Sequence, residues 1–174
     1  MMTLIIIVLA ALIGFCLYAK DRPDTFRLER RIDVGASPEK VFPLVNDFHS
    51  WAGWSPWEKL DPNMQRTYAG TPSGVGTKYA WEGKGQAGSG SMEITESAPS
   101  SFIAIDLNFL KPFKARNLTE FIFTPKDGGT EVLWAMSGSL NFMMKVMHIF
   151  MNMDKVVGKD FEQGLANLKQ LAEQ

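Results

Sequence analysis

The sequence predicts an α+β fold in which a curved antiparallel sheet clasps an amphipathic C-terminal helix. Two observations lead to this fold class. Residues 26–140 read almost entirely as β-strands separated by turns, so a sheet is the natural partner for an apolar helix face. In residues 141–174, apolar residues recur at steps of three, four or seven, as on one side of a single long helix: Met143, Met147, Phe150, Val157, Phe161, Leu165 and Leu168.

Composition sets the scale of the protein and excludes several classes of function. The 174 residues are 45% hydrophobic and 21% charged, which suits one globular domain with a sizeable core. A net charge of -1 gives no broad basic field, so nucleic acid is not expected as a partner. Cys16 is the only cysteine, which leaves no intrachain disulfide and no thiolate metal site.

The first segment, residues 2–19, is an almost unbroken apolar run that just reaches the length of a membrane-spanning helix. A cleaved signal peptide is the alternative, but no basic residue precedes the run and Leu17 disrupts a small-residue cleavage site ending at Ala19. We therefore expect residues 1–20 to be an uncleaved membrane anchor. The basic residues that follow favour a cytoplasmic soluble domain: Lys20, Arg22, Arg27, Arg30 and Arg31.

After a short linker over residues 21–24, a ligand-binding domain is expected over residues 25–174. Residues 25–34 alternate as a strand, and Ser37-Pro38-Glu39 has the capping hydroxyl, first-turn proline and acid that begin a helix. Next come three of the five tryptophans within seven residues, Trp51, Trp54 and Trp57. Buried rings would make this segment a lid or part of the core, whereas exposed rings would make it a docking patch for a protein partner.

Six further strands are predicted, over residues 64–70, 76–82, 90–97, 102–109, 118–124 and 131–140, with turn residues between them. Alternation sorts their inward faces. The strand at 118–124 is ambiguous, and we expect Phe121 and Phe123 to point inward, on the face shared with Asn117 and Thr119. Other residues predicted inward are Thr77, Tyr79, Trp81, Ile103, Ile105, Leu107, Phe109, Val132, Trp134 and Met136.

Several strings carry a resemblance to a known superfamily. They are Ala-Ser-Pro-Glu-Lys-Val-Phe at 36–42, Trp-Ser-Pro-Trp at 54–57, Gly-Val-Gly-Thr at 74–77, Gly-Thr-Glu-Val at 129–132 and Phe-Glu-Gln-Gly-Leu-Ala-Asn-Leu at 161–168. With the order of elements, they resemble the START-like, or SRPBCC, superfamily, particularly its bacterial polyketide cyclase/dehydrase-like branch. The similarity runs from about residue 25 to the C-terminus.

That resemblance implies a helix-grip fold, in which a seven-stranded antiparallel sheet wraps a long C-terminal helix around an apolar ligand cavity. Residues 38–47 and the tryptophan segment would close one end. The implied ligand is a hydrophobic or amphipathic small molecule, lipid or polyketide-like, and no cofactor is implied. The implied ligand-binding residues are Trp54, Trp57, Tyr79, Trp81, Phe109, Phe121, Trp134, Met136, Met143, Met147 and Phe150.

Groups able to catalyse a reaction are few, which favours a binding module over an enzyme. His49, beside the tryptophans, is the first candidate for a general base or hydrogen-bond anchor in a cyclase, aromatase or dehydratase, although a loop histidine satisfied by water or backbone is the alternative. No metal is expected, because the two histidines are distant and no carboxylates cluster at ligand spacing. Gly-x-Gly-x-x-Gly at 83–88 leads into another strand, so it predicts a hairpin loop and not a dinucleotide site.

Overall fold

The computed structural model describes residues 1–174 and contains one seven-stranded sheet in which every neighbouring pair is antiparallel. The spatial order is β1-β7-β6-β5-β4-β3-β2, so the first and last strands in sequence are neighbours. The strands are β1 (Thr25–Val34), β2 (Gln65–Gly70), β3 (Thr77–Glu82), β4 (Ser89–Ala98), β5 (Phe102–Lys111), β6 (Ala115–Lys126) and β7 (Gly129–Ser139).

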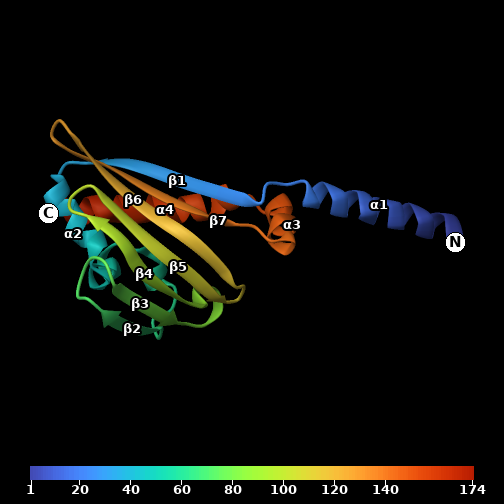
Figure 1. Ribbon diagram of the computed structural model, residues 1–174, viewed down its shortest axis with the longest axis horizontal. Helices are drawn as coiled ribbons and strands as arrows, with labels where there is room; N and C mark the ends of the chain where they lie inside the picture. The colour runs from blue at the N-terminus through green and yellow to red at the C-terminus, as the bar shows by residue number, and fades with distance from the viewer.

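The longest helix of the domain crosses the inner side of this sheet, where it packs along β1 and β7 (Figure 1). The C-terminus and the short helix that follows β1 lie at one end of the sheet, while the N-terminal helix and its neighbour lie at the other (Figure 1). The helices are α1 (Met2–Lys20), α2 (Pro38–Asn46), α3 (Phe142–Phe150) and α4 (Met153–Ala172), with short 3-10 turns η1 (Phe48–Gly53), η2 (Pro56–Lys59) and η3 (Gly85–Ala87). This arrangement is the α+β fold that the sequence pattern predicts, in the helix-grip form that the family resemblance implies.

The prediction of one continuous helix over residues 141–174 is wrong, because the chain breaks between α3 and α4. Met151 is extended, with φ -120° and ψ 121°, and the Asn152 side chain accepts a hydrogen bond of 2.9 Å from the Lys155 amide. An asparagine that caps a new helix satisfies amides that would otherwise have no partner. Because the apolar residues keep the same helical spacing on both sides of the break, the spacing alone predicts one helix where the structure has two.

Strand alternation assigns the inward faces correctly. Phe121 and Phe123 of β6 are 0% and 2% exposed, which settles the ambiguous strand in favour of the phenylalanines. Phe121 lies opposite Trp134 of β7, and the two rings stack with centroids 4.9 Å apart. Phe161 of α4 covers the other face of Trp134 at 4.0 Å. The half of the sheet under α4 is therefore filled by stacked rings.

The tryptophan segment belongs to this core. Trp51 and Trp54 are 4% and 0% exposed, and their indole N–H groups donate hydrogen bonds of 2.9 Å to the Val45 and Leu44 carbonyls of α2. Their apolar rings are buried and their single polar groups are satisfied, so both tryptophans fasten α2 to the sheet. Burial of these rings removes the exposed patch that a protein-docking role requires.

The N-terminal helix α1 projects away from the sheet (Figure 1). An 18-residue window of this 19-residue helix has a mean hydropathy of 2.6, and only Ala19 is buried. This length and hydropathy fit a membrane span or a signal sequence. The end of α1 contacts α3, where Phe15 lies 5.7 Å from Phe150 between ring centroids.

Candidate ligand-binding cavity

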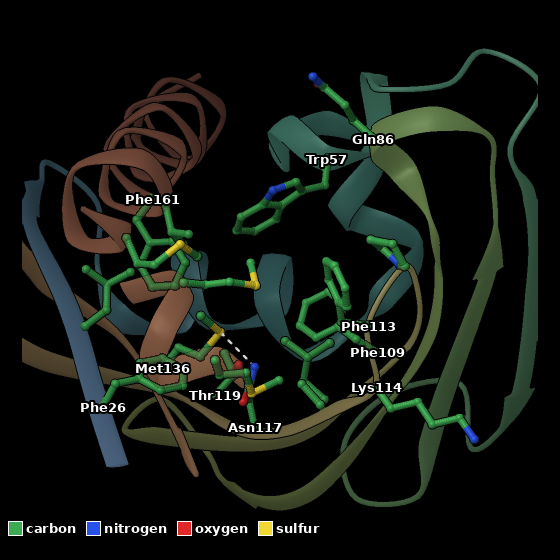
Figure 2. A pocket seen from close by; sticks show the side chains of 18 of the residues that line it. Phe26, Trp57, Gln86, Phe109, Phe113, Lys114, Asn117, Thr119, Met136 and Phe161 are labelled. Atoms are coloured by element: carbon green, nitrogen blue, oxygen red, sulfur yellow. Dashed lines mark hydrogen bonds between the residues drawn. The ribbon is translucent and has the colours of Figure 1, made fainter. Parts of the chain in front are cut away.

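A cavity of about 1000 Å³ lies between the inner face of the sheet and the two C-terminal helices. Of its 39 lining residues 25 are hydrophobic, which suits an apolar ligand, and its size is at the upper end of ordinary small-molecule pockets. Figure 2 shows the view into it, with Trp57 on one side and Met136 and Thr119 on the sheet side. The helix break explains the space, because α4 covers β1 and β7 while α3 turns toward α1.

The strands that α4 leaves uncovered supply the aromatic wall. Tyr79 and Trp81 stack along β3 with ring centroids 6.0 Å apart, and Phe109 of β5 lies edge-on to Trp81 at 5.9 Å. The Trp81 indole donates a hydrogen bond of 3.0 Å to the Ala87 carbonyl, which fixes the ring. Gly90 makes room for it, because a Cβ there would lie 2.4 Å from the Trp81 ring. The wall is therefore rigid at Trp81.

Methionines make up much of the remaining lining. The chain has ten, and every one after Met2 lines the cavity. Unbranched thioether side chains adapt to irregular shapes, so this lining can accommodate more than one ligand geometry. The eight are Met64, Met92, Met136, Met143, Met144, Met147, Met151 and Met153.

Most of the ligand-binding residues expected from the sequence lie together at this cavity. Trp54 and Phe121 do not reach it, because both are fully buried in the packed half of the core. Phe150 is 74% exposed and lies on the side of α3 that meets α1. The residues that do line the cavity are Trp57, Tyr79, Trp81, Phe109, Trp134, Met136, Met143 and Met147.

The structure places His49, the candidate general base, away from the cavity. Its Nδ1 lies 2.9 Å from an Asp47 carboxylate oxygen, and its ring stacks on Tyr68 with centroids 4.0 Å apart. The side chain is 59% exposed and is not among the lining residues. His148 lines the cavity instead, and burial lowers the pKa of its imidazole.

One titratable cluster does line the cavity. The Tyr79 hydroxyl donates a hydrogen bond of 2.5 Å to Glu58, and the Glu58 carboxylate also accepts one of 2.6 Å from Arg66. Burial raises the pKa of the Tyr79 phenol, and the hydrogen bond to Glu58 raises it further. Tyr79 therefore stays protonated at neutral pH. Sequence reasoning missed Glu58 because it lies in a short turn with no periodic signal.

Asn117 and Thr119 of β6 were also missed as cavity residues. Both are buried and line the cavity, on the strand face that carries Phe121 and Phe123. The alternation that predicted the two phenylalanines inward carries the same prediction for these polar residues, so the signal was present in the sequence.

The mouth of the cavity is marked by lining residues that are also exposed. Phe113, in the turn between β5 and β6, is 56% exposed, and Met143 and Met151 beside α3 are 62% and 45% exposed. Lys111 and Lys114 flank the turn, and Figure 2 shows the Lys114 side chain pointing away from the cavity. The opening therefore has apolar and basic residues at its rim.

A curved antiparallel sheet that holds an apolar cavity against C-terminal helices defines the helix-grip class of fold. The chain belongs to the family described as polyketide cyclase/dehydrase and lipid transport, whose model matches residues 25–173. No curated protein sequence matches the chain significantly.

Solved structures share the fold at low sequence identity. The di-domain ARO/CYC protein BexL matches with a TM-score of 0.65 at 13% identity, over 90% of this chain and 52% of that one. Protein CV1439 from Chromobacterium violaceum matches with a TM-score of 0.60 at 18% identity, over 88% and 99% of the two chains. The Aha1 dimer from Colwellia psychrerythraea matches with a TM-score of 0.56 at 15% identity, over 85% and 96%.

Proposed function

We propose that the protein is a membrane-anchored module that binds a hydrophobic or amphipathic small molecule, lipid or polyketide-like, in the cavity between sheet and helices. The cavity itself supports this proposal. It encloses about 1000 Å³, its lining is largely apolar, and it lies beside a well-packed aromatic core. Stable cores close gaps of this size, since each lost contact costs free energy. Membership of a family named for polyketide cyclases, dehydrases and lipid transport supports the same ligand class.

Residues 1–20 serve as the anchor in this proposal, and the soluble domain lies in the cytoplasm. The contact between α1 and α3 supports it, because the mouth of the cavity then lies close to the membrane boundary. Lys145 of α3 is 6% exposed, and its ammonium donates a hydrogen bond of 3.1 Å to the Lys20 carbonyl and pairs with Asp24 at 2.5 Å. An apolar ligand that partitions into the bilayer could enter through this mouth without crossing water.

The test is to ask what the full-length protein carries when it is purified from membranes. We expect native mass spectrometry to detect a bound apolar molecule, and an excess of added ligand to stabilise the protein, by about 2.7 kcal/mol at a hundredfold excess over Kd. Ala115→Trp, which fills the cavity from β6, should abolish both effects. Ile122→Trp, on the outward face of the same strand, should retain them. No bound molecule and no stabilisation by a panel of apolar ligands would refute the proposal.

A cyclase- or dehydratase-type enzyme is the second candidate, favoured by the hydrogen-bonded Tyr79–Glu58 pair at the cavity. The Tyr79 hydroxyl has one proton, so it can donate to a substrate carbonyl oxygen only when it releases Glu58, and the freed Glu58 carboxylate can then accept a proton from the substrate. Turnover of a poly-β-ketone model substrate that is lost in Tyr79→Phe, with binding retained, would support this activity. If the wild-type protein binds the substrate but does not convert it, the enzyme function is excluded and the binding function stands.

A further inference from the structure

Two polar side chains interrupt the apolar sheet wall of the cavity. Asn117 and Thr119, at alternate inward positions of β6, are 7% and 3% exposed and both line the cavity. Their neighbours on the adjoining strands are apolar: Thr119 pairs with Ile105 of β5 and Met136 of β7, and Asn117 pairs with Leu107 of β5. Figure 2 shows the Asn117 amide beside Met136 on the sheet side of the cavity.

Neither side chain is fully satisfied by the protein. No protein atom forms a hydrogen bond with Thr119 Oγ1. The Asn117 amide nitrogen donates only to Met136 Sδ, at 3.7 Å, and a thioether is a weak acceptor. A buried polar group without a strong partner costs free energy, and valine and leucine would fill the same positions without that cost. The pair therefore suits a partner that enters the cavity.

The sheet is also shaped around this polar pair. Gly138 of β7 lies opposite Asn117, and a Cβ at that position would fall 2.2 Å from Asn117 Oδ1. Because Gly138 has no side chain, the Asn117 amide of the neighbouring strand β6 can occupy the space beside it. A side chain on β7 would force Asn117 into another rotamer.

The charges around the pair point to a neutral ligand group. Arg27 lines the cavity, but its guanidinium is committed to Glu120 at 2.7 Å and Glu29 at 3.2 Å. Lys111 and Lys114 are exposed at the mouth, and the only buried lysine, Lys145, does not line the cavity. A carboxylate at Thr119 would be buried without a cation, which is costly, whereas a hydroxyl or carbonyl needs only hydrogen bonds.

We propose that Asn117 and Thr119 form a subsite for a neutral oxygen group, a hydroxyl or a ketone carbonyl, on an otherwise apolar ligand. The Asn117 amide donates to the ligand oxygen, and the Thr119 hydroxyl donates to a carbonyl or accepts from a hydroxyl. This subsite rests on the proposed binding function and names the ligand chemistry of the same cavity.

The test compares four probes of similar length, dodecane, dodecanol, methyl decyl ketone and dodecanoate, on the full-length protein in nanodiscs. Each probe partitions equally into the nanodiscs of every variant, so affinity ratios between variants report the cavity. Thr119→Val and Asn117→Leu should each weaken dodecanol and the ketone by about 3–10-fold, the range of one lost hydrogen bond, and leave dodecane unchanged. Thr119→Ser, which keeps the hydroxyl, should retain at least half of the wild-type affinity.

A second measurement separates the subsite from a structural role. Without ligand, Thr119→Val should raise Tm by about 2–4 °C, because a methyl group replaces an unsatisfied hydroxyl. Equal affinity changes for all four probes, no change for any, or a largest loss for dodecanoate would each overturn the subsite while leaving the binding function intact. Failure of every probe to bind the wild-type protein would instead overturn both proposals.

Discussion

The indole of Trp134 lies face to face with the phenyl ring of Phe161, with centroids 4.0 Å apart and planes 11° from parallel. Trp134 comes from β7 and Phe161 from α4, so this contact joins the sheet to the helix that crosses it. Both side chains are 1% exposed, and both also line the cavity. The stack therefore forms the boundary between the packed half of the domain and the open half.

Removing one ring of that stack should be costly. Phe161→Ala is expected to lower the free energy of unfolding by about 3–5 kcal/mol, because it deletes a buried ring and leaves a cavity. Val156→Ala, at a 51% exposed position on the same helix, is the control and should change stability by less than about 0.5 kcal/mol. Denaturant titration in detergent micelles measures both. Similar small effects for the two variants would mean that the stack does not hold α4.

Adding one methyl group beside the stack should also destabilise. A Cβ at Gly164 would lie 2.8 Å from the Trp134 ring and 3.2 Å from Pro56, so Gly164→Ala should cost about 1–3 kcal/mol. This loss outweighs the gain of about 1 kcal/mol that alanine normally brings to a helix. Gly158→Ala is the comparison, because its Cβ would displace the Arg30 guanidinium from Asp154 and Glu162, and losing ion pairs to such exposed carboxylates should cost less. Thermal unfolding of the two variants tests this expectation. A Gly164→Ala variant that is more stable than Gly158→Ala would contradict it.

Stability should fall in mild acid because of His148. Burial lowers its pKa below the ordinary 6.5, so between those two pKa values the unfolded chain binds more protons than the folded one. The loss of folding stability is absent at pH values well above 6.5, and it grows as the pH falls through 6.5 toward the pKa of His148 in the folded protein. Unfolding midpoints measured from about pH 7.5 to about pH 5 should decline less steeply in His148→Gln than in the wild type. An identical slope in the two proteins would show that other groups set the dependence.

The lysine that joins α3 to the end of α1 should control the mobility of the cavity mouth. Lys145→Met removes its hydrogen bond to the Lys20 carbonyl and its pair with Asp24. Amides of α3 should then exchange with solvent about 3–10-fold faster, as expected for one lost hydrogen bond, while those of β6 and β7 stay unchanged. Hydrogen exchange followed by mass spectrometry measures this, with Lys155→Met as the exposed control. Equal protection of α3 in both variants would exclude a restraint by Lys145.

Side-chain alternation in the strands carries most of what can be predicted about this protein. Because the pleat has a period of two, Tyr79, Trp81, Phe109 and Met136 share the inner side of the sheet whatever the turns between them do. Phe121 was grouped with them for the same reason and Trp54 through the family resemblance, but neither periodicity nor resemblance gives the position of a side chain along the sheet. Both lie where α2 and α4 fill the interior.

The sequence by itself determined the strand faces, the helix-grip order of elements and an apolar N-terminal segment, since each depends on local spacing and composition. Only the tertiary structure decided where the core ends and the cavity begins. That boundary depends on the break at Asn152, where one side chain caps a new helix, and on which strands α4 then covers. The positions of His49 outside the cavity and of Thr119 within it follow from the same packing, which no local pattern encodes.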